Sequence, residues 1–206
     1  GEILELVNSE SSNQLKRPLQ LVSRVVGSES TFLTHLFSPA EIDDALPLVS
    51  ELQKHRFIEV DEKRKIIKVK TGKWRVQNDI LVPPGFKFSA GAKTFLDLVS
   101  GSSILSYSPF EFIGNLDNPI TISSPDSTSQ GVAVLRSAGR SYFENVVFMN
   151  LGEKARNGNR FSGSVSFYES DVSMKNVSFL SNRSEDALNI VRSEFDLDHI
   201  IFRDIF

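Results

Sequence analysis

Short apolar stretches of three to five residues recur along the chain from Ile80 onward, and glycine, proline, serine and asparagine separate them. Residues 86–88, 95–98, 110–112 and 120–122 are examples. Such stretches are typical of strands. No helical period of useful length occurs in the last 120 or so residues. This absence excludes an alternating βαβ sheet there and predicts an all-β architecture with many short strands.

The region before residue 55 has a different pattern. Residues 38–54 are predicted as an amphipathic helix, with Ser38 as its cap and Pro39 in its first turn. The apolar face of this helix would consist of Ile42, Ala45, Leu46, Val49 and Leu52. Pro47 is expected to bend it. Residues 15–26 fit a helix or a strand, and we predict a helix.

A polar break at residues 61–64 separates two apolar runs, 57–60 and 65–70. A break of this size joins two antiparallel strands. The sequence therefore predicts a β-hairpin here.

An internal repeat distinguishes a solenoid from a sandwich. Residues 131–150, 163–182 and 186–205 align with one another, with one extra residue near Ser137 in the first segment. The matching positions are Phe143, Met174 and Leu197; Asn145, Asn176 and His199; Val146, Val177 and Ile200; and Phe148, Phe179 and Phe202. The spacing is 31 and then 23 residues, and a polar insert at 152–162 accounts for the larger value.

A coil of about 23 residues predicts a right-handed parallel β-helix, in which like side chains stack from coil to coil. The Phe148, Phe179 and Phe202 positions would form one such stack. Sixteen Phe against three Tyr and one Trp fit a core-building use, because a buried phenyl ring has no polar atom that needs a partner. Asn145 and Asn176 would occupy bends, where asparagine tolerates left-handed backbone.

Composition and charge narrow the function. The chain has 206 residues, 40% of them hydrophobic, and 23 Lys+Arg against 26 Asp+Glu leave a net charge of -3. With charges this evenly balanced, the chain as a whole has no positive electrostatic potential that would attract nucleic acid or an anionic membrane. No nucleic-acid partner is therefore expected. The absence of cysteine excludes disulfides, zinc-thiolate sites and a cysteine nucleophile. No apolar run has membrane-spanning length.

Several stretches resemble the right-handed β-helix region of bacterial proteins similar to spore coat protein H. They are residues 73–76, 80–85, 90–95, 119–122, 165–170 and 184–193. The resemblance covers roughly residues 55–206 and implies a pectate-lyase-like fold at the bacterial surface or outside the cell. It also implies further coils after residue 193, and hence a solenoid truncated at its C-terminus. In that family the β-helix follows an atypical kinase-like domain.

The kinase-type motifs of that family are absent, because the sequence has no glycine-rich phosphate loop and no metal-binding Asp pair in a matching context. The resemblance therefore carries over a fold and not phosphotransfer. The expected organisation is a small α/β cap or linker region at residues 1–72 and the β-helix at residues 73–206.

Catalysis on this fold would need a base and cationic groups or calcium to neutralise a uronate, as in polysaccharide lyases. The candidate catalytic residues are Glu185, Asp186 and Arg192. Calcium is expected only if the protein is a lyase, and no other cofactor is expected. Asp171 and Glu194, on successive coils, are a candidate pair for glycoside hydrolysis. Acidic residues at turns more often cap or face solvent.

Two basic segments have their own alternatives. Residues 63–75, with seven Lys and Arg and Trp74, would either contact phosphate or an acidic glycan or, more often in such strands, protect a sheet edge. The polar insert at 152–160 is predicted to leave the solenoid as a loop. It would offer Lys154, Arg156 and Arg160 to a ligand or be mobile.

These features predict a non-catalytic β-helix module of a larger bacterial protein, which presents a face to a polysaccharide or protein partner. The alternative is a lyase or hydrolase acting on an acidic polysaccharide. The C-terminal coil ends in apolar residues with no capping element after them, so self-association through that coil is expected.

Overall fold

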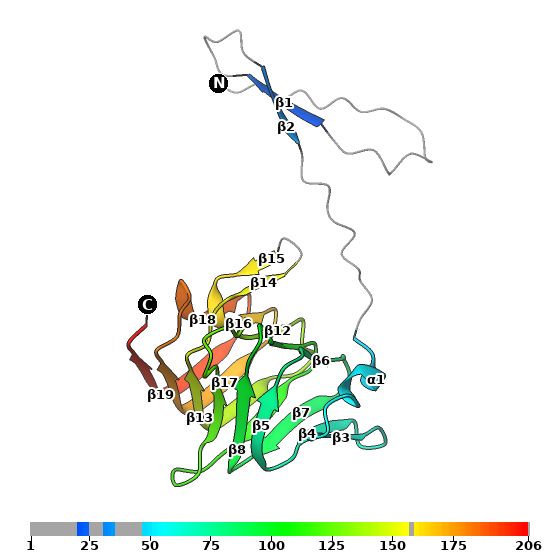
Figure 1. Ribbon diagram of the computed structural model, residues 1–206, viewed down its shortest axis with the longest axis vertical. Coiled ribbons are helices and arrows are strands. Elements are labelled where there is room, and N and C mark those ends of the chain that lie inside the picture. Colours follow the sequence, from blue (N-terminus) through cyan, green and yellow to red (C-terminus); the bar gives the residue numbers. More distant parts are fainter. Residues whose placement is uncertain (1–19, 25–30, 36–46, 157–158, 206) are drawn as a thin grey trace. The chain divides into compact units, whose positions relative to one another are not determined.

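The computed structural model describes residues 20–24, 31–35, 47–156 and 159–205, in two units, residues 1–44 and 45–206 (Figure 1). In the first unit, β1 (Gln20–Arg24) pairs antiparallel with β2 (Thr31–His35). The helix predicted over residues 15–26 is therefore wrong. The segment contains Leu21 and Val22, and valine favours the pleated backbone once a partner strand is available.

The predicted helix at 38–54 is much shorter where it is described. The α1 helix spans Val49–Leu52, and Leu48 before it has extended backbone with φ -92° and ψ 145°. Pro47 explains this start, because proline lacks the N–H of a helix interior and clashes with the preceding turn. Residues 38–46 lie outside the described residues. Leu52 is fully buried and packs in the core of the second unit.

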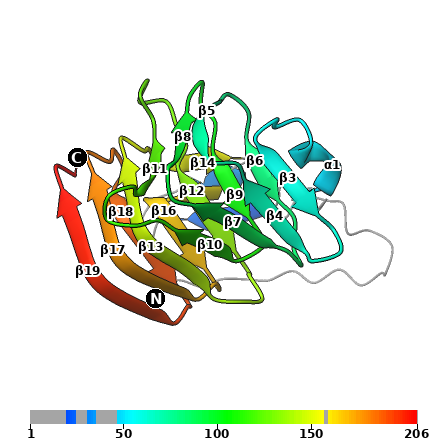
Figure 2. The same ribbon diagram turned by 90° about the horizontal axis from the view of Figure 1, so that it is seen from below.

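The second unit is a right-handed parallel β-helix of about five turns, preceded by α1 and a hairpin (Figure 2). Its first sheet contains β3 (Ile58–Asp61), β4 (Ile66–Val69), β7 (Lys87–Gly91), β10 (Phe110–Ile113) and the first halves of β13 (Ser141–Met149), β17 (Val172–Leu180) and β19 (Phe195–Arg203). The second sheet contains β5 (Gly72–Val76), β8 (Thr94–Leu98), β11 (Ile120–Ser123) and the second halves of β13, β17 and β19. The third contains β6 (Ile80–Val82), β9 (Ile104–Ser106), β12 (Val132–Leu135), β16 (Gly163–Tyr168) and β18 (Asp186–Val191).

The predicted hairpin is confirmed, because β3 and β4 pair antiparallel with Ile58 opposite Val69. The β4 strand also pairs in parallel with β7, so the parallel ladder begins at β4. The hairpin thus joins directly to the first sheet of the solenoid.

The predicted ladders are confirmed from residue 143 onward. Phe143 pairs with Met174 and Met174 with Leu197, while Phe148 pairs with Phe179 and Phe179 with Phe202. The ring centroids of Phe148 and Phe179 are 5.3 Å apart, and those of Phe179 and Phe202 are 5.0 Å apart. Apolar rings stacked from coil to coil build the continuous core, because each coil buries the inward face of the one before it.

The predicted register of the preceding strands needs a correction. The sequence alignment sets Val132 opposite Ser164, but Val132 pairs with Val165. The first of the three segments therefore holds two extra residues rather than one. The bend after β12, at residues 136–140, takes up both, since the equivalent bends at 169–171 and 192–194 are shorter.

Bends recur in columns of residues with left-handed backbone. The bend within β13, β17 and β19 falls at Asn145, Asn176 and His199, with φ of 52°, 53° and 53°. The prediction that these residues occupy bends is confirmed. Asparagine is several-fold enriched in this conformation because its short amide bonds to nearby backbone. These bends separate the first sheet from the second.

The insert at 152–160 leaves the solenoid between β13 and β16, and forms the antiparallel strands β14 (Lys154–Arg156) and β15 (Asn159–Phe161). The insert therefore leaves the solenoid where it was predicted to, and it contains a hairpin. The side chains of Lys154, Arg156 and Arg160 lie outside the described part of the structure. No helix among the described residues is long and apolar enough to cross a membrane.

Candidate functional surface

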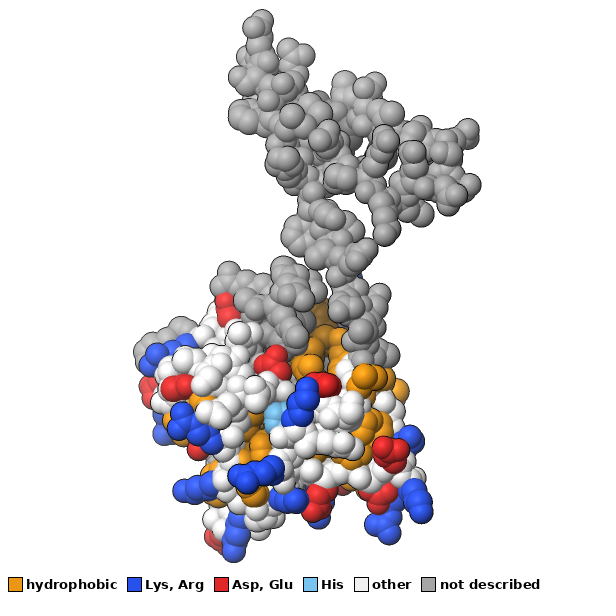
Figure 3. Space-filling model, turned by 45° about the vertical axis from the view of Figure 1, so that its right-hand side comes forward, with side chains coloured by type: hydrophobic (Ala, Val, Ile, Leu, Met, Phe, Trp, Pro, Cys, Tyr) orange, Lys and Arg blue, Asp and Glu red, His pale blue; other side chains and the backbone are white. Residues whose placement is uncertain are grey.

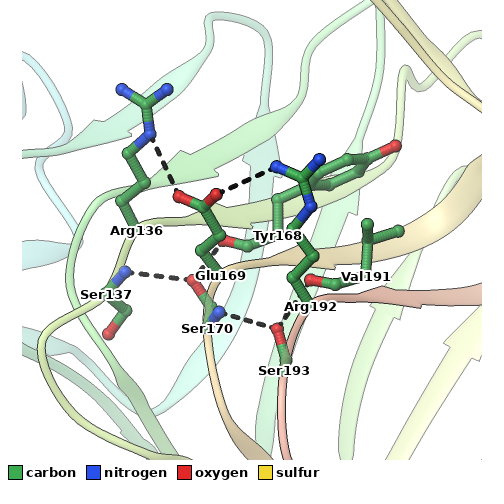
Figure 4. Close-up of polar contacts among 8 residues, drawn as sticks. All are labelled: Arg136, Ser137, Tyr168, Glu169, Ser170, Val191, Arg192 and Ser193. Atoms are coloured by element: carbon green, nitrogen blue, oxygen red, sulfur yellow. Dashed lines mark hydrogen bonds and ion pairs between the residues drawn. The ribbon is translucent and has the colours of Figure 1, made fainter.

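A charged column occupies the bend that follows the third sheet on three successive coils. Arg136, Glu169 and Arg192 hold equivalent positions, and all have left-handed backbone. Glu169 lies between the two arginines: its Oε2 is 3.5 Å from Arg136 Nε, and its Oε1 is 3.4 Å from Arg192 Nη1 (Figure 4). Arg192, a predicted catalytic residue, is thus one end of an ion-pair column that links coils.

A row of serines runs beside this column. Ser170 Oγ accepts a hydrogen bond from Ser137 N at 3.0 Å, and Ser193 Oγ accepts one from Ser170 N at 2.8 Å. Each hydroxyl also donates to its own coil, Ser170 to Tyr168 O and Ser193 to Val191 O. The hydroxyls therefore satisfy backbone groups where the sheet pairing stops, which is a structural use of serine.

The predicted hydrolase pair, Asp171 and Glu194, is brought together, with an arginine between the carboxylates. Arg140 Nη2 is 3.9 Å from Asp171 Oδ2 and 3.0 Å from Glu194 Oε2. Asp171 Oδ1 also accepts a hydrogen bond from Glu194 N at 2.8 Å. Both acids contact the same arginine, and Asp171 also bonds to backbone of the neighbouring coil, so this arrangement ties the coils together.

The structure does not bring the three predicted catalytic residues together. Glu185 and Asp186 are exposed at the start of β18, and Arg192 is exposed just after its end. The six residue steps from Asp186 to Arg192 span roughly 20 Å in an extended strand. Asp186 instead accepts a hydrogen bond from Ser162 Oγ at 3.1 Å. Within the described ranges, no cluster of three or more His, Cys, Asp or Glu that could hold a metal is present.

Large side chains are exposed in the middle of the first sheet. Tyr142 on β13 is 50% exposed, and Ile113 at the end of β10 is 40% exposed. The two are diagonal neighbours, since Ile113 pairs with Glu144 and Tyr142 with Glu111. We call the outward side chains Glu111, Ile113, Tyr142, Glu144 and Lys175 the central face. Its charges are mixed, and Lys175 Nζ lies 4.0 Å from Glu144 Oε1.

Sequence reasoning missed the central face. The alternation in residues 141–144 assigns Tyr142 to the side opposite Phe143, which is a signal for an outward tyrosine. The pairing of Tyr142 with Glu111 depends on the 31-residue step between Phe112 and Phe143, and neither the repeat nor a local motif predicts that step.

Two described groups have clearly shifted pKa values. Burial lowers the pKa of His55, partly opposed by the Asp79 carbonyl, 3.2 Å from its Nε2, and by the Asp79 charge. Hydrogen bonds lower the pKa of Asp126 to about 2, above all the one from Ser100 N at 2.9 Å. Thr128 and Ser124 add further donors to the same carboxylate. Both groups join neighbouring segments of the solenoid, and neither lies on the central face.

No protein-family model, curated protein or solved structure matches the chain. The class that the fold defines is that of parallel β-helix proteins. What the protein binds or does has to be inferred from its own surface.

Proposed function

We propose that this protein is a non-catalytic β-helix module that presents an outer face to a polysaccharide or protein partner. The exposed aromatic of the central face carries the proposal: Tyr142 is 50% exposed in the interior of a parallel sheet, with strands paired on both sides of its own. A tyrosine held on a rigid strand offers apolar contact area and a hydroxyl with little entropy to lose on binding.

The surroundings of Tyr142 suit recognition. Ile113 adds aliphatic area, while Glu111, Glu144 and Lys175 add donors and acceptors at the margin. An apolar centre with a polar margin is the usual anatomy of a recognition surface. The coils behind it are packed through buried rings, so the face is preorganised.

The placement of the charged residues supports a non-catalytic role. The acids that were candidates for hydrolysis, Asp171 and Glu194, share one arginine. The candidates for lyase action lie at opposite ends of β18. Acid–base catalysis needs groups that are available and within reach of one reacting bond, whereas the hydrolase pair is held by Arg140 and the lyase set is spread along β18.

The test is binding of the 206-residue chain to an array of neutral and acidic oligosaccharides, with wild type, Tyr142→Ala and Leu48→Ala compared. Leu48 is a large apolar residue that is 66% exposed and lies outside the central face, so its truncation is the matched control. Loss of binding in Tyr142→Ala alone supports the proposal. Equal binding by all three variants contradicts the assignment of the face. Ultraviolet absorbance from an unsaturated product with polygalacturonate would overturn the non-catalytic role and favour the lyase alternative.

We also propose that the 206-residue chain self-associates through the edge of β19. Phe195 and Phe202 on this strand are 61% and 53% exposed, although their side chains continue buried ladders. The outer edge of β19 pairs with no other described strand. A second copy that paired its own β19 there would cover backbone groups and apolar rings together.

Sedimentation velocity over a range of concentrations tests this association. We expect a concentration-dependent shift to larger species in wild type and its loss in Phe195→Asp. Tyr142→Asp, which adds the same charge on the central face, should leave the shift unchanged. A wild-type chain that stays monomeric at high concentration contradicts the proposal.

A further inference from the structure

Charge is distributed unequally along the solenoid. Residues 51–93 contain 11 Lys and Arg and 5 Asp and Glu, a net charge of +6, whereas residues 94–206 contain 9 and 14, a net charge of -5. Because a solenoid arranges its coils in sequence order, this difference becomes a polarity along its axis. The near-neutral total of -3 conceals it.

The positive end has cations on outward positions of the first two coils. Lys68 lies on β4 and Lys87 on β7, both on the first sheet. Lys73 and Arg75 lie on β5 of the second sheet, and Lys93 lies in the bend before β8. All five side chains are exposed. We call them the basic region. In Figure 3, which turns the right-hand side of Figure 1 forward, Lys and Arg side chains lie along the lower rim with Asp and Glu side chains among them.

Most of the basic region is free to meet an external anion. Lys87 pairs with Glu111, but Lys68, Lys73, Arg75 and Lys93 form no ion pair with any described residue. The nearby Asp97, which faces Arg75 across the ladder, accepts a hydrogen bond from Ser123 Oγ at 2.6 Å. These four cations therefore have no ion-pair partner among the described residues, and a bound anion would supply one.

Edge protection explains only part of the region. The β5 strand is an edge of the second sheet, so Lys73 and Arg75 fit that role. The β4 strand is internal, between β3 and β7, and Lys93 lies in a bend. Lys68 and Lys93 therefore guard no sheet edge, and their cationic character needs another explanation.

We propose that the basic region binds a carboxylated polysaccharide, with Lys68, Lys73, Arg75 and Lys93 as the cations that contact its uronate groups. This inference goes beyond the proposed function: it names a ligand class and a second binding surface, on the first two coils and outside the central face. Four of the five cations are lysine, which contacts anions as a hydrated point charge and does not require the bidentate geometry that arginine reads. The carboxylates of a linear polyuronate match such a set.

The aromatic residues nearby favour a polysaccharide over a single-stranded nucleic acid. The Trp74 ring stacks on Phe57, with centroids 5.6 Å apart, and its Nε1 donates to Lys70 O at 2.7 Å. Lys73 Nζ lies over the Phe95 ring, 5.3 Å from its centroid, in a cation–π contact. Each ring thus already has a partner on one face, which leaves less ring surface for a base, and base stacking supplies much of the affinity in single-strand binding.

The experiment measures binding of polygalacturonate by calorimetry from about 20 to 200 mM salt. The test variant carries Lys68→Gln, Lys73→Gln, Arg75→Gln and Lys93→Gln. The control carries Arg136→Gln, Arg183→Gln, Arg192→Gln and Arg203→Gln, which removes the same charge from the later coils and leaves the central face unchanged. All eight residues are exposed, so both variants should fold, and circular dichroism would verify it.

We expect the test variant to lose about tenfold or more in affinity at low salt. Its affinity should also depend less steeply on salt, because fewer contacts release fewer counterions on binding. The control should bind as wild type does. Equal losses in both variants would show a net-charge effect and overturn the inference. Tighter binding of single-stranded DNA than of polygalacturonate would also overturn it. Wild-type binding to neutral glycans alone, abolished by Tyr142→Ala, would remove this inference and leave the proposed function standing.

Discussion

The β17 and β19 strands have the same pattern of side chains and very different burial. Phe179 on β17 is fully buried, whereas Phe202, stacked on it at 5.0 Å, is 53% exposed. Val172 is likewise buried and its partner Phe195 is 61% exposed. The two strands differ in whether another coil covers them. The hydrophobic pattern therefore defines which side chains point inward, and the neighbouring coil determines how much each one stabilises the fold.

The strongest test of this comparison is truncation of one ring on each strand. Phe179→Ala should lower the free energy of unfolding by about 3–5 kcal/mol, because it removes a buried ring and leaves a cavity. Phe202→Ala should cost only about 1 kcal/mol, since half of its ring already contacts water. Urea denaturation of both variants measures the difference. Equal losses would mean that β19 is covered in solution, as the proposed self-association requires at high concentration.

A smaller difference is expected in the bend between the two sheets. Asn145 is buried, and its Nδ2 donates to Gly114 O at 3.3 Å, whereas His199 at the equivalent position is exposed. Asn145→Ala should cost about 1–2 kcal/mol, from the left-handed backbone and the lost hydrogen bond. His199→Ala should cost less, because its side chain is exposed and contacts only the exposed Asp198 rather than a buried backbone group. Asn145→Gly, which retains the left-handed bend, separates the two contributions by urea denaturation.

The opposite end of the solenoid offers a pH-dependent test. Burial lowers the pKa of His55 below its ordinary value of 6.5, so the folded state holds the ring neutral. Asp79 opposes the shift and Lys54 adds to it. The unfolded chain therefore binds more protons below pH 6.5, and stability should fall as the pH decreases from there toward the lowered pKa. Urea midpoints of wild type and His55→Gln at pH 7.5 and 5 measure this, and an equal fall in both would exclude His55 as the cause.

The smallest effect is expected from the charged column. Glu169→Gln removes two exposed ion pairs, to Arg136 and Arg192, and should cost less than about 1 kcal/mol. The measurement is the melting temperature at low and high salt, and the small difference should vanish at high salt. A loss comparable with that of Phe179→Ala would show that the column, rather than the ring stack, holds the coils together.

The repeat in the last third could be recognised from the sequence, because each coil places apolar residues at the same inward positions. Phe143, Met174 and Leu197 pair as the alignment predicted, and so do Phe148, Phe179 and Phe202. The alignment was wrong before Phe143, because the two additional residues of the 136–140 bend leave no mark in the apolar pattern. Bends tolerate insertions since they carry little of the core, so their length is weakly determined by local sequence.

The candidate site was the least predictable part. Arg192 and Asp186 are close in sequence, yet a straight strand holds them apart, while Glu169 and Arg192 meet from different coils. Tyr142 was outside the predicted site for the same reason, whereas Lys68, Lys73 and Arg75 lie in the basic segment 63–75 that the sequence had already indicated. Distances between side chains on different coils depend on how many residues each coil contains, and that number varies from coil to coil.

The sequence by itself determined the period-two strands, the coil-to-coil equivalence of the inward residues and the asparagine bends, because each depends on local backbone preference and on the separation of apolar from polar side chains. Only the tertiary structure decided which charges pair, which residues surround Tyr142 and which cations have no ion-pair partner among the described residues. Those properties arise between coils, where residues 20 to 30 positions apart become neighbours.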